Sequence, residues 1–223
     1  VSGISNAVEN VIVARDIILA EETGARLHLC HCSTKESVEL VRDAKKKGIK
    51  VSGEVCPHHF TLTEDDIVEG DANYKMNPPL RTKADVDALK AGLRDDIMEV
   101  ISTDHAPHTA EEKAKDLKSA PFGIVGMETA AALTFTELVK TGYLTPMGMA
   151  EKMSTNPARI LGINKGDISV GHLADITIFD PKDTYEINAA EFASKGKNMP
   201  FEGRKVTGRV VGTILDGRIV YQK

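Results

Sequence analysis

The chain has 223 residues, of which 41% are hydrophobic and 27% are charged, and its formal net charge is -5. This composition is typical of an ordinary globular protein with one domain, or with one large and one small domain. A negative chain without a basic cluster argues against nucleic acid or an anionic membrane as the main partner. No apolar run approaches the ~20 residues that span a bilayer.

The cysteine content bears on the compartment. The three cysteines are Cys30, Cys32 and Cys56. So low and odd a number is typical of a reducing environment rather than of a disulfide framework, and we expect a cytoplasmic protein. The sequence starts at Val1 without an initiator Met, and a helical pattern follows almost at once. We therefore expect the chain to be part of a longer protein, or a processed or truncated one.

Apolar periodicity predicts helices that alternate with strands in the first part of the chain, and mainly strands near its end. Ser33 and Glu36 have the spacing of a capping box, and Asp216-Gly217 is a typical hairpin turn. The segment 58–80 is expected to be a long functional loop. The expected helices are 5–22, 33–47, 82–93, 127–139, 146–153 and 156–161, and the expected strands are 26–32, 49–56, 97–103, 175–180, 206–215 and 218–221.

This order of elements indicates an α/β protein, because strands that alternate with helices form parallel βα units. An eight-stranded barrel needs about 250 residues, and residues 1–163 contain three expected strands. The sequence therefore predicts either an open sheet or part of a barrel over 1–163. A smaller β element follows over 164–223.

The strand expected at 97–103 leads directly to a group of potential ligands. Asp104 follows its apolar run, and His105 and His108 lie close by in the sequence. A carboxylate in this position is costly to bury unless it is paired with a cation or a metal. Barrel enzymes keep their chemistry at this end of their strands. We interpret Asp104 as a metal ligand that could also accept a proton.

Other histidines also end expected strands. Alternation puts His31 on the strand face opposite to Cys30 and Cys32, which argues against a shared zinc knuckle. A structural role is the alternative for His31. His58 and His59 follow the second strand, and each could either enter a site or serve the fold.

Two loop motifs offer polar groups to a ligand. Asn77 precedes two prolines and carries two donors and an acceptor, although a turn-forming Asn is the alternative. Gly123 in Phe122-Gly123 would let the backbone come close to a ligand, or it forms a simple turn. The sequence contains no full glycine-rich phosphate loop, no Gly-x-Ser-x-Gly and no His-Glu-x-x-His.

Six motifs occur in one order along nearly the whole chain. They are His-Cys-Ser-Thr-Lys-Glu-Ser (31–37), Glu-Val-Cys-Pro-His-His (54–59), Asn-Tyr-Lys-Met-Asn-Pro-Pro-Leu-Arg (73–81), Asp-His-Ala-Pro-His (104–108), Ala-Pro-Phe-Gly (120–123) and Asn-Pro-Ala (156–158). Together they resemble class I bacterial dihydroorotases, which belong to the amidohydrolase superfamily. The segment 166–178 is similar to the C-terminal β element of that superfamily.

The resemblance implies the C-terminal half of a (β/α)8 TIM barrel with a small β-sandwich. It implies an enzyme with two zinc ions that interconverts N-carbamoyl-L-aspartate and (S)-dihydroorotate in pyrimidine (UMP) biosynthesis. His31 and Asp104 match zinc ligands, and Asp104 also matches the catalytic proton acceptor. The positions that match substrate-binding residues are Asn77, His108, Phe122 and Gly123.

Several parts of the family's site have no counterpart in this chain. These are a His-x-His motif with a substrate-binding Arg, a bridging carboxylate and a further histidine. Zinc uses about three or four protein ligands, so His31 and Asp104 alone should bind it poorly. We therefore expect the chain by itself to be inactive. A half barrel exposes strand edges, so we expect it to self-associate or to need its missing half.

Two alternatives stay open. A hydantoinase or allantoinase belongs to the same superfamily, although the motifs 104–108 and 77–81 are more similar to those of dihydroorotases. A dihydroorotase-like chain can also be a non-catalytic partner of aspartate transcarbamoylase. The presence of His31 and Asp104 argues against that role.

Overall fold

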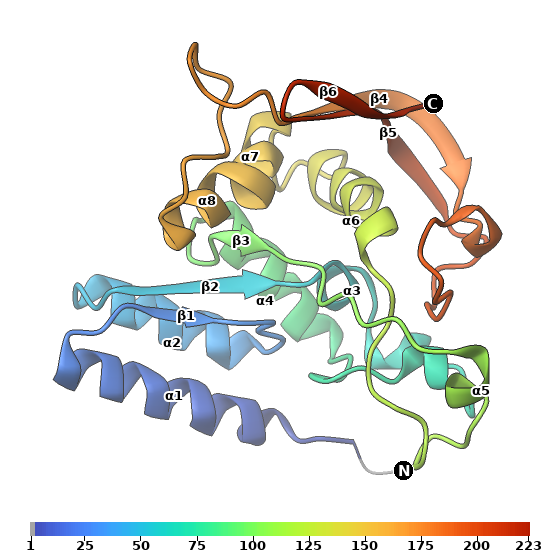
Figure 1. Ribbon diagram of the computed structural model, residues 1–223. Coiled ribbons are helices and arrows are strands. Elements are labelled where there is room, and N and C mark those ends of the chain that lie inside the picture. The colour runs from blue at the N-terminus through green and yellow to red at the C-terminus, as the bar shows by residue number, and fades with distance from the viewer. Residues whose placement is uncertain (1–2) are drawn as a thin grey trace. The chain divides into compact units, whose positions relative to one another are not determined.

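The computed structural model describes residues 3–223, which form two compact units (Figure 1). The first unit comprises the chain up to Met127 together with Ala189–Pro200. The second comprises Glu128–Asn188 and Phe201–Lys223. This division does not coincide with the boundary expected after residue 163, which stays a prediction about the domains of the protein.

A parallel three-stranded sheet lies at the centre of the first unit, in the order β1-β2-β3. β1 (Leu27–Leu29) pairs with β2 (Val51–Val55), and β2 pairs with β3 (Val100–Ile101). Parallel βα units are thus confirmed, but β1 and β3 are shorter than expected. His31 has a positive φ of 38°, so the backbone leaves the extended conformation within the range expected for the first strand, and Asp104 has a positive φ of 47° just beyond the range expected for the third.

Helices cover one face of this sheet. α1 (Asn6–Thr23) packs against β1 and α2 (Lys35–Lys46), and α2 packs against β2 and α4 (Lys83–Arg94) (Figure 1). Gly92 permits the close approach of α4 to α2, since a Cβ there would lie 2.8 Å from a methyl group of Val38. Residues of β2 alternate between buried and half-buried positions. The half-buried positions, which include Ser52 and Glu54, therefore leave polar side chains on the face opposite to the helices.

The helix start at α2 differs from the expected one. Thr34 is the N-cap, and its hydroxyl accepts a hydrogen bond from the backbone nitrogen of Ser37 at 3.0 Å. The capping box expected from Ser33 and Glu36 is therefore wrong. Ser33 instead donates hydrogen bonds to the carboxylate of Glu9, from its backbone nitrogen and from its hydroxyl.

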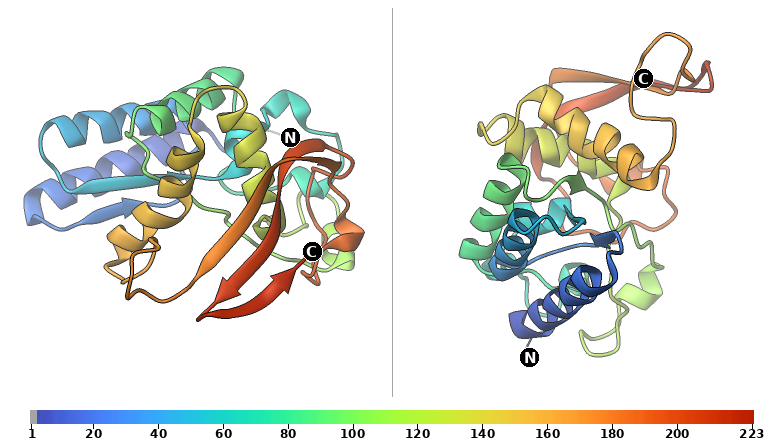
Figure 2. Two further views of the ribbon diagram at one scale, coloured as in Figure 1. Left: turned by 90° about the horizontal axis from the view of Figure 1, so that it is seen from above. Right: turned by 90° about the vertical axis from the view of Figure 1, so that its left-hand side faces the viewer.

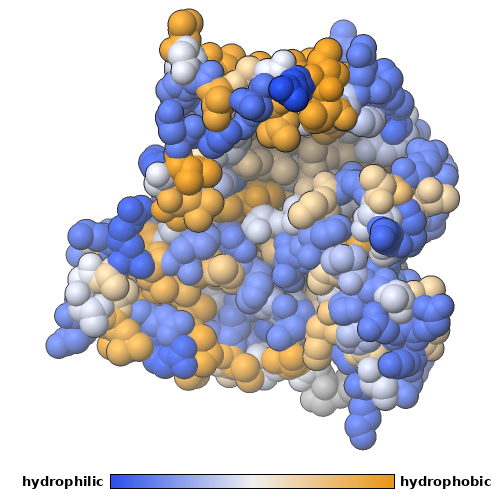
Figure 3. Space-filling model, viewed as in Figure 1, coloured by the Kyte–Doolittle hydropathy of each residue, from blue (hydrophilic) through white to orange (hydrophobic). Residues whose placement is uncertain are grey.

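α1 has the expected cap at Ser5 and the expected left-handed stop at Gly24. Its buried side chains are few, and Val13 and Ile17 are among them. The apolar residues from which the helix was predicted are 43–66% exposed. Figure 3 shows apolar residues, in orange, on this face of the molecule. We call these residues of α1 the α1 stripe, and they are Val8, Val11, Ile12, Ile18 and Leu19.

The loop expected over 58–80 is partly helical. Pro57 opens the short helix α3 (Pro57–Thr61), as its fixed φ favours a first turn. The 3-10 turns η1 (Glu64–Asp66) and η2 (Ala72–Tyr74) follow. Further along, α5 (Ala110–Lys113) forms a single turn in the polar loop. These short elements order a segment that periodicity alone leaves irregular.

The second unit combines helical segments with an antiparallel sheet. The sheet has the order β4-β5-β6, and Figure 2 shows the long twisted pair β4 and β5 with the shorter β6. Asp216 and Gly217 both have a positive φ, which confirms the expected hairpin turn. The helical segments of the second unit are α6 (Met127–Thr134, beginning at the last residue of the first unit), η3 (Phe135–Val139), α7 (Pro146–Ala150), η4 (Glu151–Thr155) and α8 (Asn156–Leu161). Its strands are β4 (Ile176–Glu186), β5 (Lys205–Leu215) and β6 (Arg218–Gln222).

The turn η5 (Ala189–Glu191) belongs to the first unit. Among the helices of residues 3–223, none combines the length and the apolar character that crossing a membrane requires.

Candidate active site

His31 and Asp104 lie just beyond the carboxyl ends of β1 and β3. Both side chains belong to half-buried residues. Because the strands are parallel, these ends share one edge of the sheet. A positive φ in a residue other than glycine is uncommon and is concentrated at functional sites. The structure thus places both predicted ligands where a βα protein keeps its chemistry.

The donor types fit a zinc site, since imidazole nitrogen and carboxylate oxygen are both common zinc ligands. Their number does not complete one. In the described part of the chain, the groups of three or more potential donors that lie within 4.8 Å of one another include neither His31 nor Asp104. Zinc uses about three or four protein ligands, so these two side chains alone would leave such a site incomplete.

Glu54 of β2 fastens the end of β1. Its Oε1 accepts a hydrogen bond from the backbone nitrogen of His31 at 3.2 Å, and its Oε2 lies 3.1 Å from Nε2 of His28. Burial raises the pKa of Glu54, but hydrogen bonds from His28, His31 and Ser102 outweigh this effect and bring the pKa below its ordinary value. The sequence analysis missed Glu54. The alternation of the strand, which puts Ser52 and Glu54 on the same face, could have indicated that Glu54 faces the site.

A second carboxylate fastens the turn that follows β1. Oε1 of Glu9 accepts hydrogen bonds from the backbone nitrogens of Ser33 and Thr34 at 2.8 and 3.2 Å, and from the hydroxyl of Ser37 at 2.8 Å. Arg81, which is 5% exposed, pairs with the other oxygen at 3.5 Å. Glu9 of α1 therefore joins the start of α2 to the loop that contains Asn77.

Three predicted substrate-binding positions, His108, Phe122 and Gly123, lie together in the segment that follows β3. Nε2 of His108 is 2.9 Å from the carbonyl oxygen of Phe122. Gly123 has a φ of 119°, and a Cβ there would lie 2.4 Å from the Cβ of Ala106. Only glycine fits this close approach between the two segments.

Asn77 is connected to this group through Lys75. The carbonyl oxygen of Lys75 accepts a hydrogen bond from the backbone nitrogen of Gly123 at 2.9 Å. Its ammonium group donates to the carbonyl of Ala120 at 2.5 Å and lies 4.4 Å from the ring centroid of Phe122. Asn77 itself is exposed. Its loop and the segment around Phe122 are therefore held side by side.

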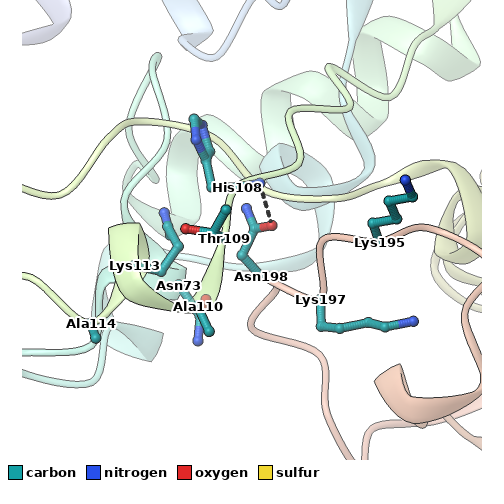
Figure 4. A pocket seen from close by; sticks show the side chains of 9 residues that line it. All are labelled: Asn73, His108, Thr109, Ala110, Lys113, Ala114, Lys195, Lys197 and Asn198. Atoms are coloured by element: carbon teal, nitrogen blue, oxygen red, sulfur yellow. Dashed lines mark hydrogen bonds between the residues drawn. The ribbon is translucent and has the colours of Figure 1, made fainter.

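Asn198 is the positioning residue that the sequence analysis missed. Its Oδ1 accepts a hydrogen bond from the backbone nitrogen of His108 at 2.9 Å (Figure 4). Its Nδ2 donates to the carbonyls of Ala106 and Gly123, each at 3.1 Å. Asn198 is 6% exposed. No local pattern could have revealed it, because its partners lie far upstream in the sequence.

A pocket of about 350 Å³ opens beside His108 within the first unit. Lys113 on its wall is 8% exposed, and its ammonium group donates to the carbonyls of Pro121 and Gly123 at 3.2 and 3.0 Å. Burial, followed by the charge of Lys75, lowers the pKa of Lys113. The residues that line the pocket are Asn73, His108, Thr109, Ala110, Lys113, Ala114, Lys195, Lys197 and Asn198, and Figure 4 shows Lys195 and Lys197 extending away from His108.

Of the remaining histidines of the motifs, His59 and His105 make hydrogen bonds that link segments of the fold, whereas Nε2 of His58 is buried without a hydrogen-bond partner among residues 3–223. His58 and His59 are buried, and Nε2 of His59 lies 2.8 Å from the carbonyl oxygen of Pro78. Burial lowers the pKa of both imidazoles, that of His59 to about 4. Nδ1 of His105 accepts a hydrogen bond from the backbone nitrogen of Gly126 at 3.0 Å. These contacts anchor the loops before Pro79 and before α6.

Curated proteins similar to this chain carry the name dihydroorotase. The protein from Pelotomaculum thermopropionicum is 53% identical over 220 residues, and that from Geobacillus sp. is 51% identical over 221 residues. Each alignment covers 99% of this chain and 52% of the relative. The chain thus spans about half the length of the curated relatives it matches.

Solved structures that resemble this chain include related cyclic-amide hydrolases. The dihydropyrimidinase from Brevibacillus agri has a TM-score of 0.91 at 30% identity, covering 96% of this chain and 48% of that one. The L-hydantoinase from Arthrobacter aurescens has a TM-score of 0.89 at 32% identity, covering 96% and 49%. The model of the Amidohydrolase family matches residues 4–220. The chain belongs to the amidohydrolase family and has its α/β fold.

Proposed function

We propose that a protein containing this chain is a dihydroorotase, a zinc-dependent hydrolase that interconverts N-carbamoyl-L-aspartate and (S)-dihydroorotate in pyrimidine biosynthesis. One observation carries this proposal. Proteins named dihydroorotase share 50–53% identity with nearly the whole chain, whereas the similar hydantoinase structures share 28–32%.

The proposed architecture is the second half of a (β/α)8 barrel followed by a β-sandwich. The sheet β1-β2-β3 would supply three consecutive barrel strands, with α1, α2 and α4 on the outside. The sheet β4-β5-β6 would form part of the sandwich. The polar face of β1 and β2 supports this proposal, because barrel strands alternate between an interior and a helix-covered face.

In the proposed reaction, His31 and Asp104 would hold zinc together with ligands from outside this chain. Zinc, when bound, polarises a carbonyl group and lowers the pKa of water. Asp104 accepts the proton of the water that attacks the cyclic amide, and it delivers that proton to the leaving ring nitrogen. Glu54 and Glu9 hold the turn at His31 in place during these steps.

Substrate recognition is proposed for Asn77, His108 and the backbone of Phe122 and Gly123. The exposed amide of Asn77 can both donate to and accept from a ring amide. His108 stands at the wall of a pocket, where its imidazole would contact the carboxylate of the substrate. Asn198 and Lys75 hold these groups in one arrangement.

The α1 stripe and the outer edges of β1 and β3 support a proposal about assembly. Large apolar patches and open strand edges mark surfaces that other protein segments cover. We propose that the chain self-associates, or that it binds the remaining half of the barrel, in the cytoplasm. Aspartate transcarbamoylase is the alternative partner if the protein lacks catalysis.

A substrate panel tests the proposed function. The complete zinc-loaded protein would be assayed with dihydroorotate, hydantoin, dihydrouracil and allantoin. We expect the highest kcat/KM for dihydroorotate. A preference for one of the other cyclic amides would identify a different hydrolase. No turnover, together with stable binding to aspartate transcarbamoylase, would identify the non-catalytic role.

A further inference from the structure

We propose that His28, Cys30 and Glu54 form a metal site of their own, which takes a divalent ion of the zinc class. One donor atom from each of these side chains lies within 4.8 Å of the others. An imidazole, a thiol and a carboxylate are the three donor types of protein zinc sites. Neither His31 nor Asp104 belongs to this group.

The strands bring these residues together. His28 lies on β1, and its register partner on β2 is Ser52. Glu54 lies two residues beyond Ser52 on the same face of β2, because side chains alternate, and Cys30 is the first residue after the end of β1. Strand pairing therefore fixes His28 and Glu54, and Cys30 joins them from the end of the strand.

The hydrogen bonds of His28 orient one ring nitrogen toward the site. Its Nδ1 lies 2.8 Å from the hydroxyl of Ser52, and that hydroxyl donates to the carbonyl oxygen of Leu27 at 3.3 Å. The hydroxyl can therefore accept a proton from Nδ1, and this contact turns Nε2 toward Glu54. Metal-binding histidines are typically held in this way through their other nitrogen.

Nε2 of His28 faces the second oxygen of Glu54. Oε2 of Glu54 lies 3.1 Å away, within hydrogen-bond distance, and Oε1 is already held by the backbone nitrogen of His31. A metal ion would replace this hydrogen bond by binding both groups, and the adjacent sulfur of Cys30 would provide a third ligand. The hydrogen bond between His28 and Glu54 without a metal ion is the competing arrangement.

Solvent reaches the site in this half-length chain. The side chains of His28 and Glu54 are 26% and 13% exposed, and Cys30 is exposed. In the proposed barrel this face lines the interior, so water or a group from the other half would take the fourth position of a tetrahedral ion. On binding, the thiol of Cys30 forms a sulfur–metal bond and releases its proton to solvent, so charge and atoms balance. The cluster of Cys56, His58 and His59 is buried and lacks such access.

Cobalt(II) tests the proposal, because a thiolate ligand gives a sulfur-to-cobalt charge-transfer band in the near ultraviolet. The complete protein, reduced and freed of metal, would be titrated with cobalt alone. We expect a band that saturates at one ion per chain and disappears when zinc is added. Cys30→Ser should abolish it, and His28→Asn and Glu54→Gln should each weaken cobalt binding by at least about tenfold.

Matched variants decide between this site and the alternatives. Cys32→Ala and Cys56→Ala should keep the band, as should Asp104→Asn, which removes the proposed catalytic ligand but no sulfur. A band that is lost in Cys56→Ala and kept in Cys30→Ser would overturn the proposal in favour of the buried cluster. No band in the folded wild-type chain would also overturn it, leaving His28 and Glu54 to share a proton. Circular dichroism checks that each variant is folded.

Discussion

The amide oxygen of Asn198 accepts a hydrogen bond from the backbone nitrogen of His108 at 2.9 Å, although the two residues are 90 positions apart. The nitrogen of the same amide donates to the carbonyls on either side of the close contact between Ala106 and Gly123. One buried side chain thus holds both loops of the proposed substrate site. Its effect on catalysis would be through His108 and not through direct chemistry.

Replacing Asn198 should weaken substrate binding more than turnover. Asn198→Asp keeps an oxygen for the nitrogen of His108 but loses both donors, so the carbonyls of Ala106 and Gly123 lose a partner. We expect KM for dihydroorotate to rise several-fold, and the free energy of unfolding to fall by about 1–3 kcal/mol. Steady-state kinetics and urea unfolding of the complete protein measure both. The exposed Asn164→Asp should change neither, and an unchanged KM in Asn198→Asp would refute the positioning role.

Removing the carboxylate of Glu9 should destabilise the turn after β1. Glu9→Ala leaves Arg81 as a buried charge without its anion and leaves the hydroxyl of Ser33 without its acceptor. We expect a loss on the order of 3 kcal/mol in the free energy of unfolding. Urea titration checks this, with Glu22→Ala on the exposed side of α1 as the control. Equal stability of the two variants would contradict the role given to Glu9.

Stability should fall when the pH drops from about 6.5 to 4, because the unfolded chain then binds protons that the folded chain excludes. Burial holds the pKa of His59 at about 4, against an ordinary value of 6.5. Because the folded value is the lower one, this stability is complete above pH 6.5 and is lost as the pH falls. The loss is on the order of 3 kcal/mol.

His59→Gln removes this titration while its amide can still donate to the carbonyl of Pro78. Its unfolding free energy should therefore depend less on pH in this window than that of the wild type. His172→Gln, at a half-buried histidine that pairs with Asp167 in the second unit, serves as the control. Identical pH slopes for the wild type and His59→Gln would show that His59 is not held neutral.

Local periodicity was sufficient to predict most elements, but not the contacts that link distant segments. The helix at α1 followed from its spacing and from Ser5 and Gly24, and the hairpin from Asp216-Gly217. The length of β1 could not be predicted in this way. The backbone turns left-handed at His31, whose nitrogen is bound by the carboxylate of Glu54 from another strand.

The same limit applies to the site. The strand-end positions of His31 and Asp104 could be predicted from an apolar run that ends in polar residues. The N-cap at Ser33 was mispredicted because the hydroxyl and the backbone nitrogen of Ser33 donate hydrogen bonds to Glu9, which belongs to a different helix. Asn198 offered no local signal, since it lies far from His108 in sequence and its neighbours show no periodicity.

The α1 stripe should drive association of the isolated chain. Its side chains are 43–66% exposed, and burying them would remove apolar surface from water. We expect light scattering to detect oligomers whose fraction rises with concentration. The double variant Val11→Glu/Ile18→Glu should reduce that fraction, whereas Glu22→Lys on the same helix should not. If the wild-type chain is a folded monomer at every concentration, the α1 stripe does not drive association.

Hydrolysis of dihydroorotate tests the central claim most directly. With zinc present, the complete protein should turn over dihydroorotate, and its Asp104→Asn variant should lose on the order of 10²–10⁴-fold in kcat. The 223-residue chain alone should show little or no turnover, because His31 and Asp104 are too few ligands for zinc. Retention of most of the rate in Asp104→Asn, or full turnover by the isolated chain, would contradict the account.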